Sequence, residues 1–168
     1  MHVREIMKTN VFKIRIGTTF TNVARQLLEF VVSGAPVVDN ADRLLGIISE
    51  KDLFRAIYPR YQDFYEAPEA FLDFQKLENE ATSIKDAPVE SFMSRRLITA
   101  SPDTPILKIG AIMVATGIHR VPVVENGILV GMVSRGDIYR AILREYFDLW
   151  DIERKRLDQP NRQNQDKI

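Results

Sequence analysis

The sequence predicts an α/β protein made of two copies of one unit, each a strand, a helix, two strands and a second helix. Three blocks occur twice in the same order. The spacing is 86 residues for the first two blocks, as from Met7 to Met93, and 85 for the third, as from Gly46 to Gly131. Such self-similarity at a near-constant offset indicates one structural unit used twice.

The elements of the unit follow from residue periodicity. Apolar side chains recur at helical spacing from Phe20 to Val31 and from Ile106 to Val114, and two apolar runs with a turn between them come after each helix. Asn126-Gly127 is typical of a two-residue hairpin. The expected strands are 11–14, 36–38 and 44–48 in the first copy and 97–99, 122–125 and 128–133 in the second.

Polar residues mark the helix starts. The second helix of each copy is expected to begin at Ser49 and at Ser134. Thr18 and Thr104 occupy equivalent positions before the first helices, where the simplest role for both is an N-cap. Pro105 then suits the first helical position, where its missing N–H costs nothing.

The duplication divides the chain into four segments. We expect a first repeat at 1–58, an acidic, aromatic-rich and partly helical connector at 59–88, a second repeat at 89–145, and a helix extension with a polar tail at 146–168. Eight acidic and three basic residues lie between 59 and 90. The last helix is expected to run from about 136 to about 157, with an apolar stripe wide enough to meet a partner.

Composition excludes several classes of function. The chain has no Cys, two His, and 23 basic against 23 acidic side chains. This argues against disulfides, thiolate or histidine metal sites and general nucleic-acid binding, so we expect no metal and no nucleic-acid partner. Apolar runs are too short for a spanning helix, which predicts a cytoplasmic protein with no membrane partner. One His outside the N-terminus supplies no plausible nucleophile–base set, which argues against an enzyme.

The repeated blocks resemble a tandem pair of CBS domains, the Bateman module, over residues 3–57 and 89–143. The resemblance implies two pseudo-symmetric repeats packed sheet to sheet, with clefts between them that bind adenosine-containing ligands. AMP, ADP, ATP, S-adenosylmethionine and NAD-type molecules are the ligand class. It also implies a stand-alone, non-enzymatic regulatory module that signals by conformational change and needs no obligatory cofactor. Such a module is expected to work as a homodimer and to act on a protein partner that the sequence does not name.

Two interpretations of the Ser-x-x-Asp blocks stay open. Ser49 with Asp52, and Ser134 with Asp137, fit a capping box that opens a helix. The same helix start suits phosphate, and the carboxylate can accept hydrogen bonds from a ribose diol. In the CBS family this Asp contacts ribose and this Ser lies near phosphate.

The resemblance also groups residues into two clefts. One cleft would combine Thr18, Ser33, Ser134, Asp137 and Arg120, and the other Thr104, His119, Ser49 and Asp52. Val32 and Ile118 would sandwich the adenine. A guanidinium suits phosphate oxygens.

The first copy departs from this pattern. It has Ser33 and Gly34 where the second copy has His119 and Arg120, and Lys51 is its partial replacement. This difference and the apolar stripe motivate the alternative of a ligand-silent interaction scaffold.

Overall fold

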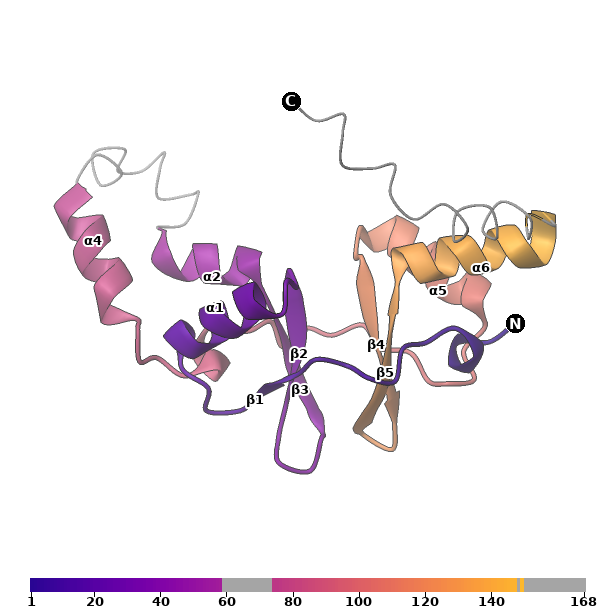
Figure 1. Cartoon of the computed structure of the whole chain (residues 1–168), viewed down its shortest axis with the longest axis horizontal. Coiled ribbons are helices and arrows are strands. Elements are labelled where there is room, and N and C mark those ends of the chain that lie inside the picture. The colour runs from indigo at the N-terminus through magenta and orange to yellow at the C-terminus, as the bar shows by residue number, and fades with distance from the viewer. Residues whose placement is uncertain (59–73, 148, 150–168) are drawn as a thin grey trace.

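Two sheets stand side by side at the centre of the molecule, and helices cover their outer faces (Figure 1). This computed structural model describes residues 1–58, 74–147 and 149. The arrangement is a mixed α/β fold of two similar halves, which confirms the predicted fold class.

The first half contains a three-stranded sheet in the order β1-β2-β3. β1 is parallel to β2, and β2 is antiparallel to β3. Ser49 precedes the second helix, as the sequence predicts. The elements are a short 3-10 turn η1 (Val3–Glu5), β1 (Ile14–Arg15), α1 (Phe20–Glu29), β2 (Gly34–Val38), β3 (Leu44–Ser49) and α2 (Glu50–Ile57).

The second half repeats this order around an antiparallel pair, β4-β5. Helix α4 lies in the predicted connector, while residues 59–73 fall outside the described residues, as does the expected continuation of the last helix to about 157. The elements are α4 (Phe74–Ser83), a 3-10 turn η3 (Val89–Ser91), α5 (Ile106–Thr116), β4 (Arg120–Glu125), β5 (Ile128–Ser134) and α6 (Arg135–Phe147). No helix in the described part of the chain is long and apolar enough to cross a membrane.

The strand predicted at 11–14 is limited to Ile14–Arg15, and the strand predicted at 97–99 does not form. Only Ala100 pairs with Val123, in the same parallel register as Ile14 with Val37 in the first half. In the first half the pairing continues, because the N–H of Ile16 donates to the Val38 carbonyl. The equivalent residue in the second half is Pro102, which has no N–H, so the pairing stops there.

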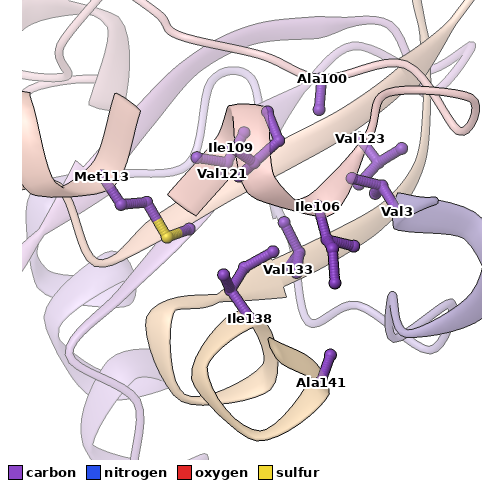
Figure 2. Packing of buried hydrophobic residues seen from close by; sticks show 10 residues of the cluster. All are labelled: Val3, Ala100, Ile106, Ile109, Met113, Val121, Val123, Val133, Ile138 and Ala141. Carbon is purple, nitrogen blue, oxygen red and sulfur yellow. The ribbon is translucent and has the colours of Figure 1, made fainter. Parts of the chain in front are cut away.

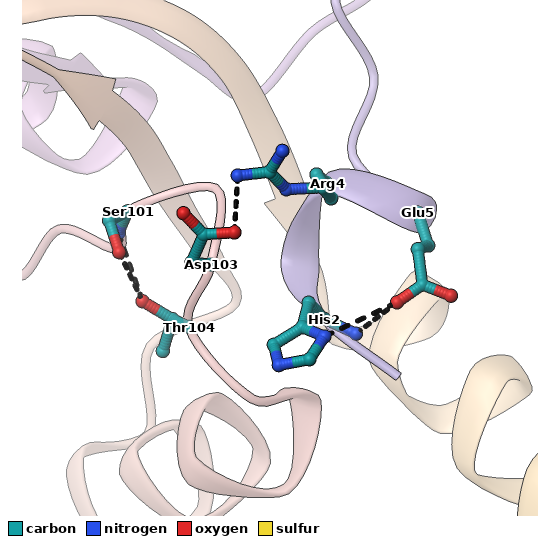
Figure 3. A network of polar contacts seen from close by, with 6 residues as sticks. All are labelled: His2, Arg4, Glu5, Ser101, Asp103 and Thr104. Atoms are coloured by element: carbon teal, nitrogen blue, oxygen red, sulfur yellow. Dashed lines mark hydrogen bonds and ion pairs between the residues drawn. The ribbon is translucent and has the colours of Figure 1, made fainter.

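The predicted N-caps are displaced by one residue. Thr19 and Pro105 occupy the cap positions of α1 and α5, and neither makes a side-chain cap bond. The Thr18 hydroxyl donates to the Arg15 carbonyl. The Thr104 hydroxyl accepts from the Ser101 N–H and bonds the Ser101 hydroxyl (Figure 3). Both threonines therefore shape the loops before the helices.

The repeats exchange the segments that precede them. Val3 belongs to the buried core of the second half, where Figure 2 shows it among Ile106 and Val123, and Val89 belongs to the core of the first half. The Val3 N–H donates to the carbonyl of Thr104, and the Val89 N–H donates to that of Thr18. Each hydrophobic core is thus completed by the other repeat's leading segment.

Two glycines make room for the exchanged segments. A Cβ on Gly46 would lie 2.5 Å from the Met93 sulfur, and one on Gly131 would lie 2.8 Å from the Met7 sulfur. Contacts this short do not occur with real side chains. The repeated Met and the repeated Gly are therefore partners across the two halves.

The halves also meet through their hairpin tips and strand edges. The Leu44 N–H donates to Gly127, and the Leu129 N–H donates to Asp42. Farther along β3, Ile47 and Ser94 exchange two backbone hydrogen bonds of 3.0 and 2.8 Å. These contacts fix the start of the second repeat beside the end of β3, which is where a cavity opens.

Candidate functional site

Both Ser-x-x-Asp blocks form capping boxes with closely matched geometry. Oδ2 of Asp52 accepts from the Ser49 N–H at 2.9 Å and the Ser49 hydroxyl at 2.5 Å, and the Asp52 N–H donates back to the hydroxyl. Asp137 and Ser134 repeat these contacts, with the same two distances. Capping therefore accounts for one carboxylate oxygen in each copy and leaves the other to be explained.

The second carboxylate oxygen differs between the copies. Oδ1 of Asp137 accepts from Arg140 at 2.6 Å and forms an ion pair with it. Oδ1 of Asp52 makes no hydrogen bond to any of the described residues. Asp52 therefore keeps an acceptor available for a ligand.

Asp137 is the more enclosed of the two, with 9% of its surface exposed. Burial alone would raise the pKa of Asp137. Hydrogen bonds from Ser134 and the charges of Lys8 and Arg140 outweigh burial and hold its pKa below the ordinary value. This carboxylate is charged, and its charge is compensated within the protein.

A cavity of about 670 Å³ lies where the two repeats meet beside Asp52. Its volume is within the range of small-molecule sites. Five stretches of chain supply its walls: the start of β2, the junction of β3 and α2, the segment after Met93, the start of β4, and β5. The lining residues are Ser33, Gly34, Ala35, Ile47, Ser49, Lys51, Asp52, Ser94, Arg96, Leu97, Ile98, Gly117, Ile118, His119, Arg120 and Met132.

The polar lining of this cavity favours an anion. Lys51, Arg96 and Arg120 supply three permanent positive charges, and Asp52 is the only carboxylate among the described lining residues. Arg120 donates to the neutral Ser33 hydroxyl at 2.9 Å. No ion pair within the described residues neutralises any of the three cations.

Another part of the cavity wall is apolar. Ile118 and Leu97, both half-buried, come from different segments of the second repeat. With the neighbouring aliphatic side chains they make a surface suited to a flat heterocycle. An acceptor, an apolar wall and a cationic rim thus occur in one cavity.

Seven of the residues expected at a ligand site line this cavity together. They are Ser33, Ser49, Lys51, Asp52, Ile118, His119 and Arg120. The grouping by clefts needs correction, because Ser33 and Arg120 lie with Asp52 and not with Asp137. The Arg120–Ser33 hydrogen bond joins equivalent ends of β4 and β2 across the seam between the repeats.

Thr18 and Thr104 do not line this cavity, and Thr18 is separated from Ser33. Because β1 is parallel to β2, Thr18 lies beyond Val38, whereas Ser33 precedes the other end of β2. A strand of this length separates the two ends by roughly 13 Å. Thr104 follows Ala100 in the same direction along β4, away from Arg120.

Three other expected residues lie elsewhere. Val32 packs against the first core and is not part of the lining. Ser134 and Asp137 are at the equivalent position in the second repeat, outside the described cavity.

Sequence reasoning missed the segment just after Met93. Ser94, Arg96, Leu97 and Ile98 all line the cavity. The signal was present, because this segment directly follows a repeated block. Its place depends on the exchange between repeats, which brings it beside β3. A smaller cavity of about 520 Å³ adjoins this region, shares Asp52 and Ser94 with it, and includes Arg55.

Comparison with known proteins agrees with the duplicated architecture. The model of the CBS domain family matches residues 3–59 and 89–144. The chain belongs to the CBS-domain family. Its two matched segments make it a CBS pair, and an uncharacterized protein of Methanocaldococcus jannaschii has similar proportions: it is 32% identical over 155 residues, which cover 85% of this chain and 92% of that protein.

CBS pairs also occur within longer proteins. The A-adding tRNA nucleotidyltransferase of Aquifex aeolicus is 31% identical over 144 residues, or 84% of this chain, but this CBS pair spans only 14% of that protein's length. The likeness is therefore to its CBS part. Among solved structures, CBSX2 in complex with AMP superposes with a TM-score of 0.64 at 25% identity, covering 85% of this chain and 96% of that one.

Proposed function

We propose that this CBS pair is a non-enzymatic regulatory module that binds an adenosine-containing nucleotide between its repeats. The observation that carries the proposal is the cavity beside Asp52. It combines an available carboxylate oxygen, an apolar wall and three uncompensated cations. The complex of CBSX2 with AMP supports an adenosine ligand for a protein of this fold.

Each part of such a ligand has a counterpart in the cavity. The ribose diol donates to Oδ1 of Asp52, and the adenine lies against Ile118 and Leu97. The phosphates lie toward Arg96 and Arg120, because guanidinium groups match phosphate oxygens and stay charged.

Ligand binding at this place would act on both repeats. Residues 33–35 and 47–52 come from one repeat, and residues 94–98 and 117–120 from the other. A ligand that binds one relative arrangement of the repeats more tightly shifts the population toward it. The ligand itself is bound and released without chemical change, and a cytoplasmic location stays a prediction.

Titration calorimetry with AMP, ADP and ATP tests this function. Asp52→Asn should weaken binding by at least about tenfold, or about 1.4 kcal/mol. Asn can keep its carbonyl oxygen on Ser49 and so retain the helix cap, while its amide group then replaces the acceptor that faces the cavity.

Glu125→Gln is the matched control. Glu125 is an exposed carboxylate at the far end of β4 from Arg120. Its replacement by Gln should leave the affinity for the nucleotide unchanged. Thermal unfolding checks that both variants are folded. If no adenosine nucleotide binds the folded wild-type protein, the proposal fails and the ligand-silent scaffold becomes the better interpretation.

We also propose a homodimer, because equivalent helices carry matching exposed apolar side chains. Leu28 on α1 and Val114 on α5 are 75% and 85% exposed, and Phe54 on α2 and Tyr139 on α6 are each 62% exposed. Covering these faces with a second copy removes the apolar surface from water.

Light scattering at micromolar concentration should then give a mass of twice 19.3 kDa. Phe54→Glu with Val114→Glu should give the monomer mass, whereas Glu125→Gln should leave the dimer intact. A wild-type protein that stays monomeric at this concentration contradicts the dimer.

A further inference from the structure

The two repeats differ in charge at the positions that would face a ligand. The cavity beside Asp52 is lined by Lys51, Arg96, His119 and Arg120. At the spacing of the duplication, the corresponding residues of the other repeat are Gly136, Asn10, Ser33 and Gly34. Each of these basic side chains has a neutral counterpart, while the lining residue Ser94 has the basic counterpart Lys8, whose charge acts on Asp137. The pseudo-symmetry of the backbone therefore does not extend to the charges.

Close packing explains why the first repeat has Gly34 where the second has Arg120. A Cβ on Gly34 would lie 2.8 Å from the carbonyl oxygen of Ile48 and 3.2 Å from the Cα of Ser49. Both are backbone atoms, so they cannot turn aside as a side chain can. A side chain at Gly34, the position equivalent to Arg120, would therefore require the backbone of the first repeat to shift.

The carboxylates of Asp52 and Asp137 also differ, and the difference again favours a ligand beside Asp52. Arg140 is paired with Oδ1 of Asp137, the oxygen that stays available on Asp52. The residue equivalent to Arg140 is Arg55, and no ion pair joins it to Asp52 in the described residues. A ribose at Asp137 would have to displace a charged partner at 2.6 Å, whereas a ribose at Asp52 would displace no ion pair within the described residues.

We propose that each chain binds one nucleoside polyphosphate, in the cavity beside Asp52, and that Arg140 occupies the equivalent acceptor on Asp137. The inference rests on the proposed function and narrows it to one site and one ligand class. Three permanent cations against one carboxylate favour a di- or triphosphate over a monophosphate, because each added phosphate brings more negative charge to the rim.

Calorimetry of the full chain with ATP, AMP and adenosine tests the inference, with ATP stoichiometry confirmed by equilibrium dialysis. We expect one ATP per chain, and an ATP affinity at least about tenfold higher than that for AMP. Asp137→Asn should change neither the stoichiometry nor the affinity by more than about twofold, whereas Asp52→Asn should weaken ATP binding.

The outcomes separate the inference from the function on which it rests. Two ATP molecules per chain, equal affinity for ATP and AMP, or loss of binding in Asp137→Asn with retention in Asp52→Asn would each overturn the inference while leaving a nucleotide-binding module. Absence of binding by all three compounds would overturn both. The wild-type stoichiometry needs no variant, so poor folding of Asp137→Asn does not prevent a decision.

Discussion

Replacing Arg96 and Arg120 together with Gln should reduce the affinity for ATP by about 100-fold and leave the affinity for adenosine nearly unchanged. Each guanidinium that meets a phosphate is expected to contribute about tenfold, or about 1.4 kcal/mol. Both residues line the rim of the cavity, and no ion pair within the described residues competes for their charge. Calorimetry with ATP and with adenosine separates the phosphate contribution from that of the nucleoside.

Arg95→Gln is the matched control. Arg95 adjoins Arg96 in sequence, is not part of the lining, and donates to the Glu90 carbonyl at 3.2 Å. It should leave the ATP affinity within about twofold of wild type. In the wild type, added salt should weaken the binding of ATP more than the binding of adenosine, because salt screens exposed charges. Equal losses for ATP and adenosine in the double variant would contradict a phosphate-binding role.

Gly46→Ala should lower the free energy of unfolding by about 1–3 kcal/mol, the usual cost of forcing extra atoms into a packed region. Its new Cβ would meet the Met93 sulfur at 2.5 Å and the Ser94 carbonyl oxygen at 3.0 Å. Gly131→Ala should act in the same way but more weakly, since its shortest contact is 2.8 Å. Thermal unfolding should show a decrease of about 2–4 °C for each kcal/mol.

Gly136→Ala is the control, because the nearest atom to its Cβ is the end of the flexible Arg140 side chain at 3.3 Å. The clash also predicts coupling between Gly46 and Met93. Gly46→Ala should cost less in a Met93→Ala background than in the wild type. If the two substitutions are additive, the Gly–Met contact across the halves is not what limits the position.

Much of the fold could be predicted from the sequence because its signals are local. The periodicity of the helices, the alternation of the hairpin strands and the two Ser-x-x-Asp caps each lie within about ten residues. The strand expected at 97–99 was placed too early, because pairing begins at Ile14 in the first half and at the equivalent Ala100 in the second. It stops after Ala100 because Pro102 cannot donate the backbone hydrogen bond that Ile16 donates. The displaced caps at Thr18 and Thr104 are errors of one residue, at helix ends where local signals are weakest.

The site was harder to predict because its composition depends on tertiary structure. Arg96 reaches the cavity only because the segment after Met93 pairs with β3 of the other repeat. Ser33 and Thr18 lie in the same repeat, yet β2 separates them. Arg140 sits three residues after Asp137, so its pairing is within local reach, but the sequence alone does not show why Arg55 behaves differently.

The reciprocal packing of Val3 and Val89 has an evolutionary consequence. Each repeat needs a segment from the other to complete its core, so a single ancestral unit would have required a domain-swapped homodimer to be well folded. Fusion of two gene copies would then have placed both exchanged segments in one polypeptide. Once the two units were joined, equivalent positions were free to diverge, as Gly34 and Arg120 have done.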